Sequence, residues 1–76
     1  MEEIVKKDWK YVLYRTEQNK FILSVVCGSV ALYDLNFRLN SEEEELFRKG
    51  GVKFLDELAE KVNYSPQLFE ERKVEI

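Results

Sequence analysis

The chain has 76 residues, 45% hydrophobic and 36% charged, and its 15 acidic side chains outnumber 12 basic ones, which gives a formal charge of −3. A chain of this length is expected to form one soluble domain with a single small core. The acidic balance disfavours nucleic-acid binding, which needs Lys and Arg against phosphates, and one Cys with no His cannot supply a zinc cluster.

The first half of the chain alternates apolar and polar residues with period two, as β-strands do. The pattern predicts three strands, over residues 9–16, 20–26 and 30–38. Two three-residue loops would join them, each ending in a residue that tolerates a left-handed backbone, Asn19 in the first and Gly28 in the second. These elements form an antiparallel meander.

The parity of the loops decides which side chains share a face, because directly opposed residues of paired strands lie on the same side of a sheet. With three-residue loops Leu13 faces Leu23, and Tyr11 faces Val25. The expected core face consists of Trp9, Tyr11, Leu13, Phe21, Leu23, Val25, Ala31, Tyr33, Leu35 and Phe37.

The second half changes to a helical period. Asn40 or Ser41 suits the N-cap position, and Ser41 with Glu44 matches a capping box. Gly50-Gly51 should separate two helices. The helices are predicted over residues 41–49 and 51–63, with an apolar stripe of Val52, Leu55, Leu58, Ala59 and Val62 on the second, a helical turn over 66–70 after Ser65-Pro66, and a candidate edge strand in the tail 72–76.

Together these elements predict an α+β fold: a three-stranded antiparallel meander, then a two-helix hairpin and a short C-terminal turn. The N-terminal residues lack the apolar run of a signal peptide, and no stretch is long enough to cross a membrane. We therefore expect a cytoplasmic protein that does not bind membranes.

No catalytic, cofactor-binding or metal-binding residue is predicted. Cys27 has no His, cation or helix start nearby to lower its pKa, so a packing role is expected for it. The acidic run Glu42, Glu43, Glu44 and Glu45 suits the first turn of a helix, where the helix dipole favours negative charge. The same run is a candidate patch for a basic partner.

A two-helix hairpin covers one face of a sheet, and the other face of this sheet is also apolar. Monomers rarely leave a large contiguous apolar patch exposed. A second copy, a different protein, or the chain's own terminal segments could cover it; we expect a homodimer. The candidate interface consists of Val12, Tyr14, Ile22, Val26 and Leu32.

Short strings spread over residues 9–72 resemble a small family of bacterial α+β proteins proposed as immunity proteins of polymorphic or contact-dependent toxin systems. The resemblance implies a non-catalytic protein that neutralises a toxin by binding it, with no cofactor. Two alternatives stay open: an enzyme subunit whose carboxylate site forms at an oligomer interface, and a structural protein unconnected with toxins. The strings are Val26-Cys27-Gly28-Ser29-Val30, Leu32-Tyr33-Asp34, Leu39 with the Glu run, Phe54-Leu55 with Leu58-Ala59, and Pro66 with Phe69 and Arg72.

Overall fold

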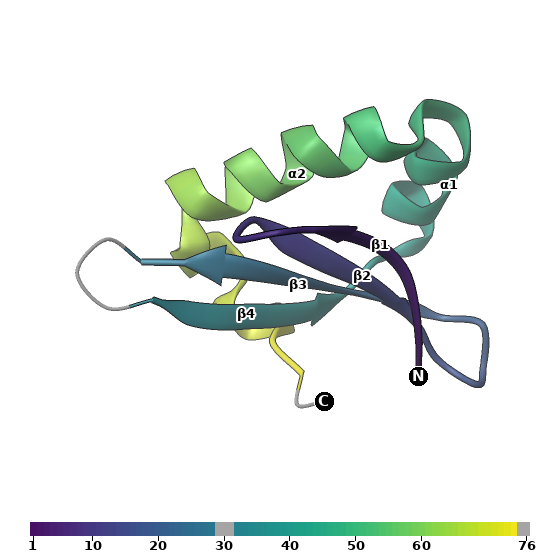
Figure 1. Cartoon of the computed structure of the whole chain (residues 1–76), viewed down its shortest axis with the longest axis horizontal. Coiled ribbons are helices and arrows are strands. Elements are labelled where there is room, and N and C mark those ends of the chain that lie inside the picture. Colours follow the sequence, from purple (N-terminus) through teal and green to yellow (C-terminus); the bar gives the residue numbers. More distant parts are fainter. Residues whose placement is uncertain (29–31, 75–76) are drawn as a thin grey trace.

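A computed structural model describes residues 1–28 and 32–74, and it shows an α+β fold of two layers (Figure 1). One layer is a four-stranded antiparallel sheet in the order β1-β2-β3-β4, and two helices lie on one of its faces. The strands are β1 (Glu2–Lys7), β2 (Tyr11–Arg15), β3 (Phe21–Cys27) and β4 (Tyr33–Arg38), and the helices are α1 (Ser41–Gly50) and α2 (Val52–Tyr64).

The sheet has one more strand than the sequence predicts, so the expectation of three strands was wrong. The additional strand, β1, pairs with β2 along the edge of the sheet. Glu and Lys are depleted in strands, and a register shift between Glu3 and Val5 interrupts the alternation that would have revealed it. Charged side chains and a bulge are also how edge strands avoid pairing with other chains.

Strand β2 begins at Tyr11, because Trp9 belongs to the turn that follows β1. The backbone of Trp9 has φ 66°, and the N–H of Lys10 donates to the carbonyl of Lys7 at 3.0 Å, which closes the turn. The core position expected for Trp9 is therefore wrong: its side chain is 84% exposed. Tyr33, also expected in the core, is exposed at the start of β4.

The hairpin between β2 and β3 confirms the predicted loop and register. Leu13 lies opposite Leu23, and Tyr11 lies opposite Val25. The backbone N–H of Thr16 donates to the carbonyl of Lys20 at 2.8 Å and closes a three-residue loop. Its last residue, Asn19, has φ 61°, the left-handed conformation that the loop type requires.

The loop that joins β3 and β4 is longer than predicted. Strand β3 continues through Cys27, whose side chain is buried in the core, and Cys27 lies opposite Tyr33, so the three-residue loop 26–28 was wrong. Gly28 has the predicted positive φ, at 103°. Both the predicted and the observed connections contain an odd number of residues. The side chains of β4 therefore point to the faces of the sheet that the sequence predicted, although their partners on β3 differ. The predicted start of this strand, at residues 30 and 31, lies outside the described residues.

The helix hairpin closes the core over one face of the sheet. Helix α1 is capped one residue earlier than the predicted Ser41–Glu44 box: Glu43 N–H donates to Asn40 Oδ1 at 2.8 Å, and Asn40 N–H donates to Glu43 Oε1 at 2.9 Å. Gly51, with φ 62°, links the helices. Of the predicted stripe only Val52 is exposed, and the buried members are Leu55, Leu58, Ala59 and Val62.

The C-terminal segment returns to the sheet through two short 3₁₀ turns, η1 (Pro66–Leu68) and η2 (Glu70–Arg72). Beyond them Lys73 forms an isolated antiparallel bridge with Phe37. The N–H of Val74 then donates to the carbonyl of Asn36 at 2.8 Å. The tail thus lies along the outer edge of β4, where one bridge replaces the full edge strand that the sequence suggested, and residues 75 and 76 lie outside the described part.

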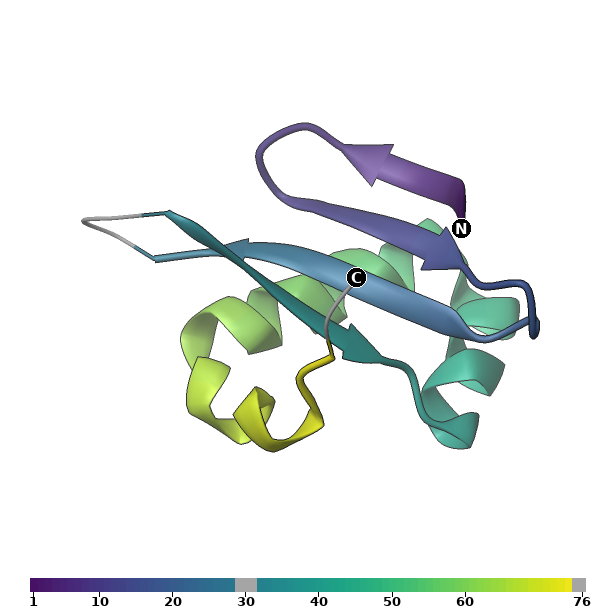
Figure 2. The same cartoon turned by 90° about the horizontal axis from the view of Figure 1, so that it is seen from below.

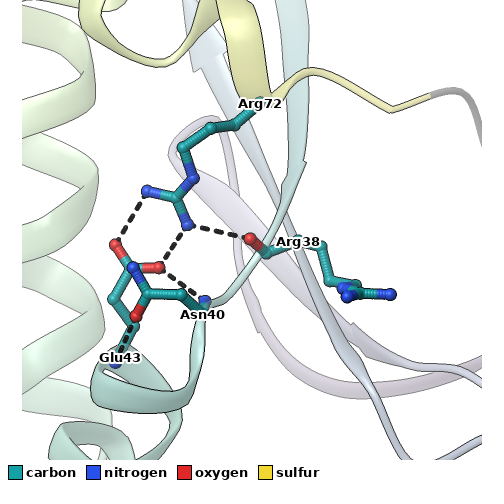
Figure 3. Close-up of polar contacts among 4 residues, drawn as sticks. All are labelled: Arg38, Asn40, Glu43 and Arg72. Atoms are coloured by element: carbon teal, nitrogen blue, oxygen red, sulfur yellow. Dashed lines mark hydrogen bonds and ion pairs between the residues drawn. The ribbon is translucent and has the colours of Figure 1, made fainter.

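One side chain connects this C-terminal segment to the start of α1 (Figure 3). Arg72 donates Nη1–H to Glu43 Oε2 at 3.1 Å and Nη2–H to Glu43 Oε1 and to the carbonyl of Arg38, the latter at 2.9 Å. Its guanidinium carbon lies 4.9 Å from the ring centre of Phe37 and 5.6 Å from that of Phe69. Glu43 therefore caps a helix and binds the C-terminal segment at once.

We expect Arg72→Met to lower the free energy of unfolding by about 1–3 kcal/mol, since it removes several charge-assisted hydrogen bonds from a half-buried site. Arg72→Lys should recover only part of the loss, because an ammonium cannot reproduce the two-pronged contact with Glu43. Urea denaturation measures both, with the exposed Arg48→Met on α1 as the control. Equal effects of Arg72→Met and Arg48→Met would contradict this role.

Candidate binding surface

The sheet face turned away from the helices is left uncovered by the helix layer. In Figure 2, seen from below, the strands lie in front of the helices, and no helix of the described chain crosses this side. We call it the open face. The strand register assigns to it Glu3, Lys6, Val12, Tyr14, Ile22, Ser24, Val26, Asp34, Asn36 and Arg38.

The structure brings together four of the five apolar residues predicted for the interface. Val12, Tyr14 and Val26 are half-buried on the open face, and Tyr14 lies directly opposite Ile22. Ile22 is only 8% exposed, since its cross-strand neighbours are the long side chains of Tyr14 and Arg38. The fifth residue, Leu32, is exposed and precedes β4, so it lies outside the paired sheet.

A hollow of about 470 Å³ indents the open face beside the β1–β2 turn. Val12, Tyr14 and Val26 form its apolar part, with Lys6 and Asp34 among the charged residues that line it. Trp9 lines the same hollow. An exposed tryptophan with positive φ is unusual, because a bulky residue is strained in that conformation.

Sequence reasoning missed Trp9 as a surface residue because it continues the alternation of β2. Asp8, a common turn residue between Lys7 and Trp9, was the signal that could have indicated the turn.

A polar pair lies in the middle of the open face. Ser24 lies opposite Asn36, between the row that contains Ile22 and the row that contains Val26. Ser24 is buried, and Asn36 Oδ1 is buried without a hydrogen-bond partner among the described residues. Buried polar atoms usually have such partners. The open face therefore combines an apolar part with polar residues, one of which carries an acceptor without a partner among the described residues.

The acidic run lies on the helix layer and not on the open face. Glu43 is occupied by the helix cap and by Arg72, and Glu44 is half-buried. Glu42 and Glu45 are exposed, and Glu45 Oε1 lies 3.9 Å from Lys49 Nζ. The four residues predicted as one patch thus contribute two exposed carboxylates.

Cys27 is buried in the core at the end of the inner strand β3 and is not presented to solvent. Burial raises the pKa of its thiol, and the negative charges of Asp34 and Glu70 raise it further. The thiol form is therefore favoured at neutral pH. Among the residues that the structure describes, no group of three or more Cys, Asp or Glu side chains is placed to hold a metal ion.

A second polar cluster joins the sheet to α2 on the covered side. The buried Tyr11 hydroxyl donates to Asp56 Oδ1 at 2.7 Å, and Lys7 Nζ donates to Asp56 Oδ2 at 2.9 Å. The hydrogen bonds from Lys7 and from Tyr11 lower the pKa of Asp56, whereas burial and the bond to Asp56 raise the pKa of Tyr11. No sequence pattern indicates this cluster, since Asp56 lies 45 positions from Tyr11 and 49 from Lys7.

Comparison with protein-family models, with curated proteins and with solved structures gives no match for this chain. No helix within the described residues has the length and apolar character needed to span a bilayer.

Cys27 should react slowly with iodoacetamide in the folded protein at pH 7.5, because its thiol is buried and its pKa is raised. We expect alkylation to be at least about tenfold slower than in denaturant, where the chain is open. Mass spectrometry over time measures both rates. Similar rates in the two states would restore the thiol as a candidate functional group.

Asp56 should make stability depend on pH in the acidic range. A carboxyl whose folded-state pKa is lowered stabilises the fold above its unfolded pKa of about 4, and that contribution is lost as the pH falls through the folded-state pKa. The difference in unfolding free energy between the wild type and Asp56→Asn should therefore shrink as the pH falls from 6 to about 3.

Urea titrations at each pH measure this difference. The matched control is Asp8→Asn, which removes an exposed carboxylate of the β1–β2 turn. A difference for Asp56→Asn that stays constant over this range would contradict the role assigned to the cluster.

Proposed function

We propose that the protein is a non-catalytic binding module that docks another protein on the open face. The observation that carries the proposal is the uncovered sheet face itself, with half-buried Val12, Tyr14 and Val26 around a hollow. Charged residues, among them Lys6 and Asp34, surround this apolar part. An apolar centre with a polar rim is the usual anatomy of a protein interface.

Trp9 and Tyr14 are suited to act as anchors of that interface. Tryptophan and tyrosine are enriched among the residues that contribute most to binding, because they bury a large area at little cost in conformational entropy. Trp9 is exposed, and both Trp9 and Tyr14 line the hollow. A docked partner would cover both rings.

Within one chain the carboxylates of the open face are too far apart for an acid and base pair, so a carboxylate site would need residues of a second copy. Glu3 is on the first strand and Asp34 on the fourth, and they are also offset along the strands, so at least three strand spacings, roughly 14 Å, separate them within one chain. The carboxylate pairs of glycoside hydrolases lie about 5–10 Å apart. With Cys27 buried as well, the described residues offer a binding surface more readily than a reaction centre.

The resemblance to immunity proteins narrows the proposal to a toxin as partner and to the cytoplasm as the location. The free, buried Cys27 is compatible with a reducing compartment. Glu42 and Glu45 would add long-range attraction for a basic toxin, because exposed charges outside an interface act mainly on the association rate.

A photo-crosslinking side chain at Val12 should capture a discrete protein in the native host, whereas the same group at Lys53 on α2 should not. The captured protein is then purified and its affinity measured by calorimetry. We expect Val12→Asp and Val26→Asp to weaken binding at least about tenfold, since each places a charge in an apolar contact.

The control is Val52→Asp, the same change at a partly exposed valine on the helix layer, which should leave affinity unchanged. Ile22 is unsuitable as a probe, because it is buried in the single chain. No capture at Val12, or equal weakening by Val52→Asp, would overturn the proposal.

A further inference from the structure

The side chains of the open face form a grid with charges at its two outer strands. The first row across the sheet is Glu3, Tyr14, Ile22 and Arg38, from β1 to β4. The second row is Lys6, Val12, Ser24 and Asn36, and the third contains Val26 and Asp34. Within the described chain Glu3, Asp34 and Arg38 take part in none of the ion pairs.

From this grid we infer that the protein seated on the open face is a second copy of the chain, related by a two-fold axis that runs parallel to the strands between β2 and β3. The inference rests on the proposed function and names a second copy, in place of a toxin, as the protein on the open face; a toxin would then have to bind another surface. A two-fold contact uses the same surface twice, so the surface must be complementary to itself. The grid meets that condition.

The rotation places β1 of one copy over β4 of the other and keeps each row in register. In the first row, Glu3 then lies over Arg38 of the second copy, and Tyr14 lies over Ile22. Stacked sheets are about 10 Å apart, a gap that Glu and Arg side chains can bridge from opposite sides. Because of the symmetry, each contact occurs twice.

The second row fits the same arrangement. Lys6 comes to lie over Asn36 of the second copy, one row away from Asp34. A small rotation of the half-buried Asn36 amide would offer Lys6 the oxygen that finds no donor within the described chain. A cation would thus approach an unsatisfied acceptor and an unpaired carboxylate.

A two-fold axis across the strands is less favourable. It would set Lys6 against Lys6 of the second copy and bring Glu3 toward the turn that contains Asp8, so like charges would meet. It would also place Arg38 over Asp34, which is attractive. The two axes therefore predict different partners for Arg38, and charge reversal can distinguish them.

The test uses two single charge reversals, Glu3→Arg and Arg38→Glu, in the full chain. Both side chains are exposed, and in Figure 3 the Arg38 side chain points away from Arg72 and Glu43, so neither change should unfold the chain. Each variant alone brings like charges together twice in its dimer. We expect each dissociation constant to rise at least about tenfold.

Mixing the two variants should restore association, because both contacts of the mixed dimer are again between opposite charges. Sedimentation velocity would show a species of about twice the 9.1 kDa monomer mass, with an affinity within about threefold of the wild type. Rescue cannot arise within one chain, since Glu3 and Arg38 are on the outermost strands. The control is Arg48→Glu on α1, which should not change association, and circular dichroism checks that each variant is folded.

Three outcomes would overturn the inference. In the first, Asp34→Arg restores the association of Arg38→Glu, whereas mixing Glu3→Arg with Arg38→Glu does not. That result would show that the two-fold axis crosses the strands. Dimers unaffected by either reversal would place the contact on another surface. A wild type that stays monomeric at about 100 μM, while crosslinking at Val12 captures a different protein, would remove the second copy as partner and leave the proposed function standing.

Discussion

Two helices can cover only one face of a four-stranded sheet, and this limit of coverage governs the molecule. The buried stripe of α2 packs against the side chains that β2, β3 and β4 direct to the same side. The N-terminal residues extend the sheet as β1, and the tail lies along the edge of β4. Both terminal segments thus widen the sheet, and the described residues leave its second face open.

The position of the helix layer depends on one charged contact as well as on the apolar core. Glu43 closes the capping box of α1 with one oxygen and receives two hydrogen bonds from Arg72, whose guanidinium also packs on two aromatic rings. Arg72 in turn binds the carbonyl of Arg38 at the end of β4. Arg72 therefore connects the sheet, the start of α1 and the C-terminal segment. Its planar guanidinium group can bind both oxygens of a carboxylate.

The same contact separates two roles that the acidic run combines in the sequence. A glutamate at the third helical position is satisfied locally by the cap, and its remaining oxygen is satisfied by a residue 29 positions away. Its neighbours Glu42 and Glu45 keep their exposure. The partner attraction that we propose for Glu42 and Glu45 and the helix stabilisation by Glu43 can thus be changed independently.

By itself the sequence determined the features that depend on neighbours along the chain: the α+β class, the helix boundaries near Gly51, the left-handed Asn19 and Gly28, and the register of the first predicted hairpin. Parity also grouped Val12, Tyr14, Ile22 and Val26 on one face, since the loop between β2 and β3 has the predicted length and side chains alternate along each strand.

The tertiary structure alone decided the features that depend on distant neighbours. Strand β1 exists because β2 offers a pairing edge, although four of its six residues are Glu or Lys, and its turn exposes Trp9. Ile22 is buried by cross-strand neighbours, Glu43 is held by Arg72, and Asp56 binds Tyr11. The alternation along a strand indicates the face of the sheet to which each side chain points. Which residues cover that face depends on contacts between distant parts of the chain.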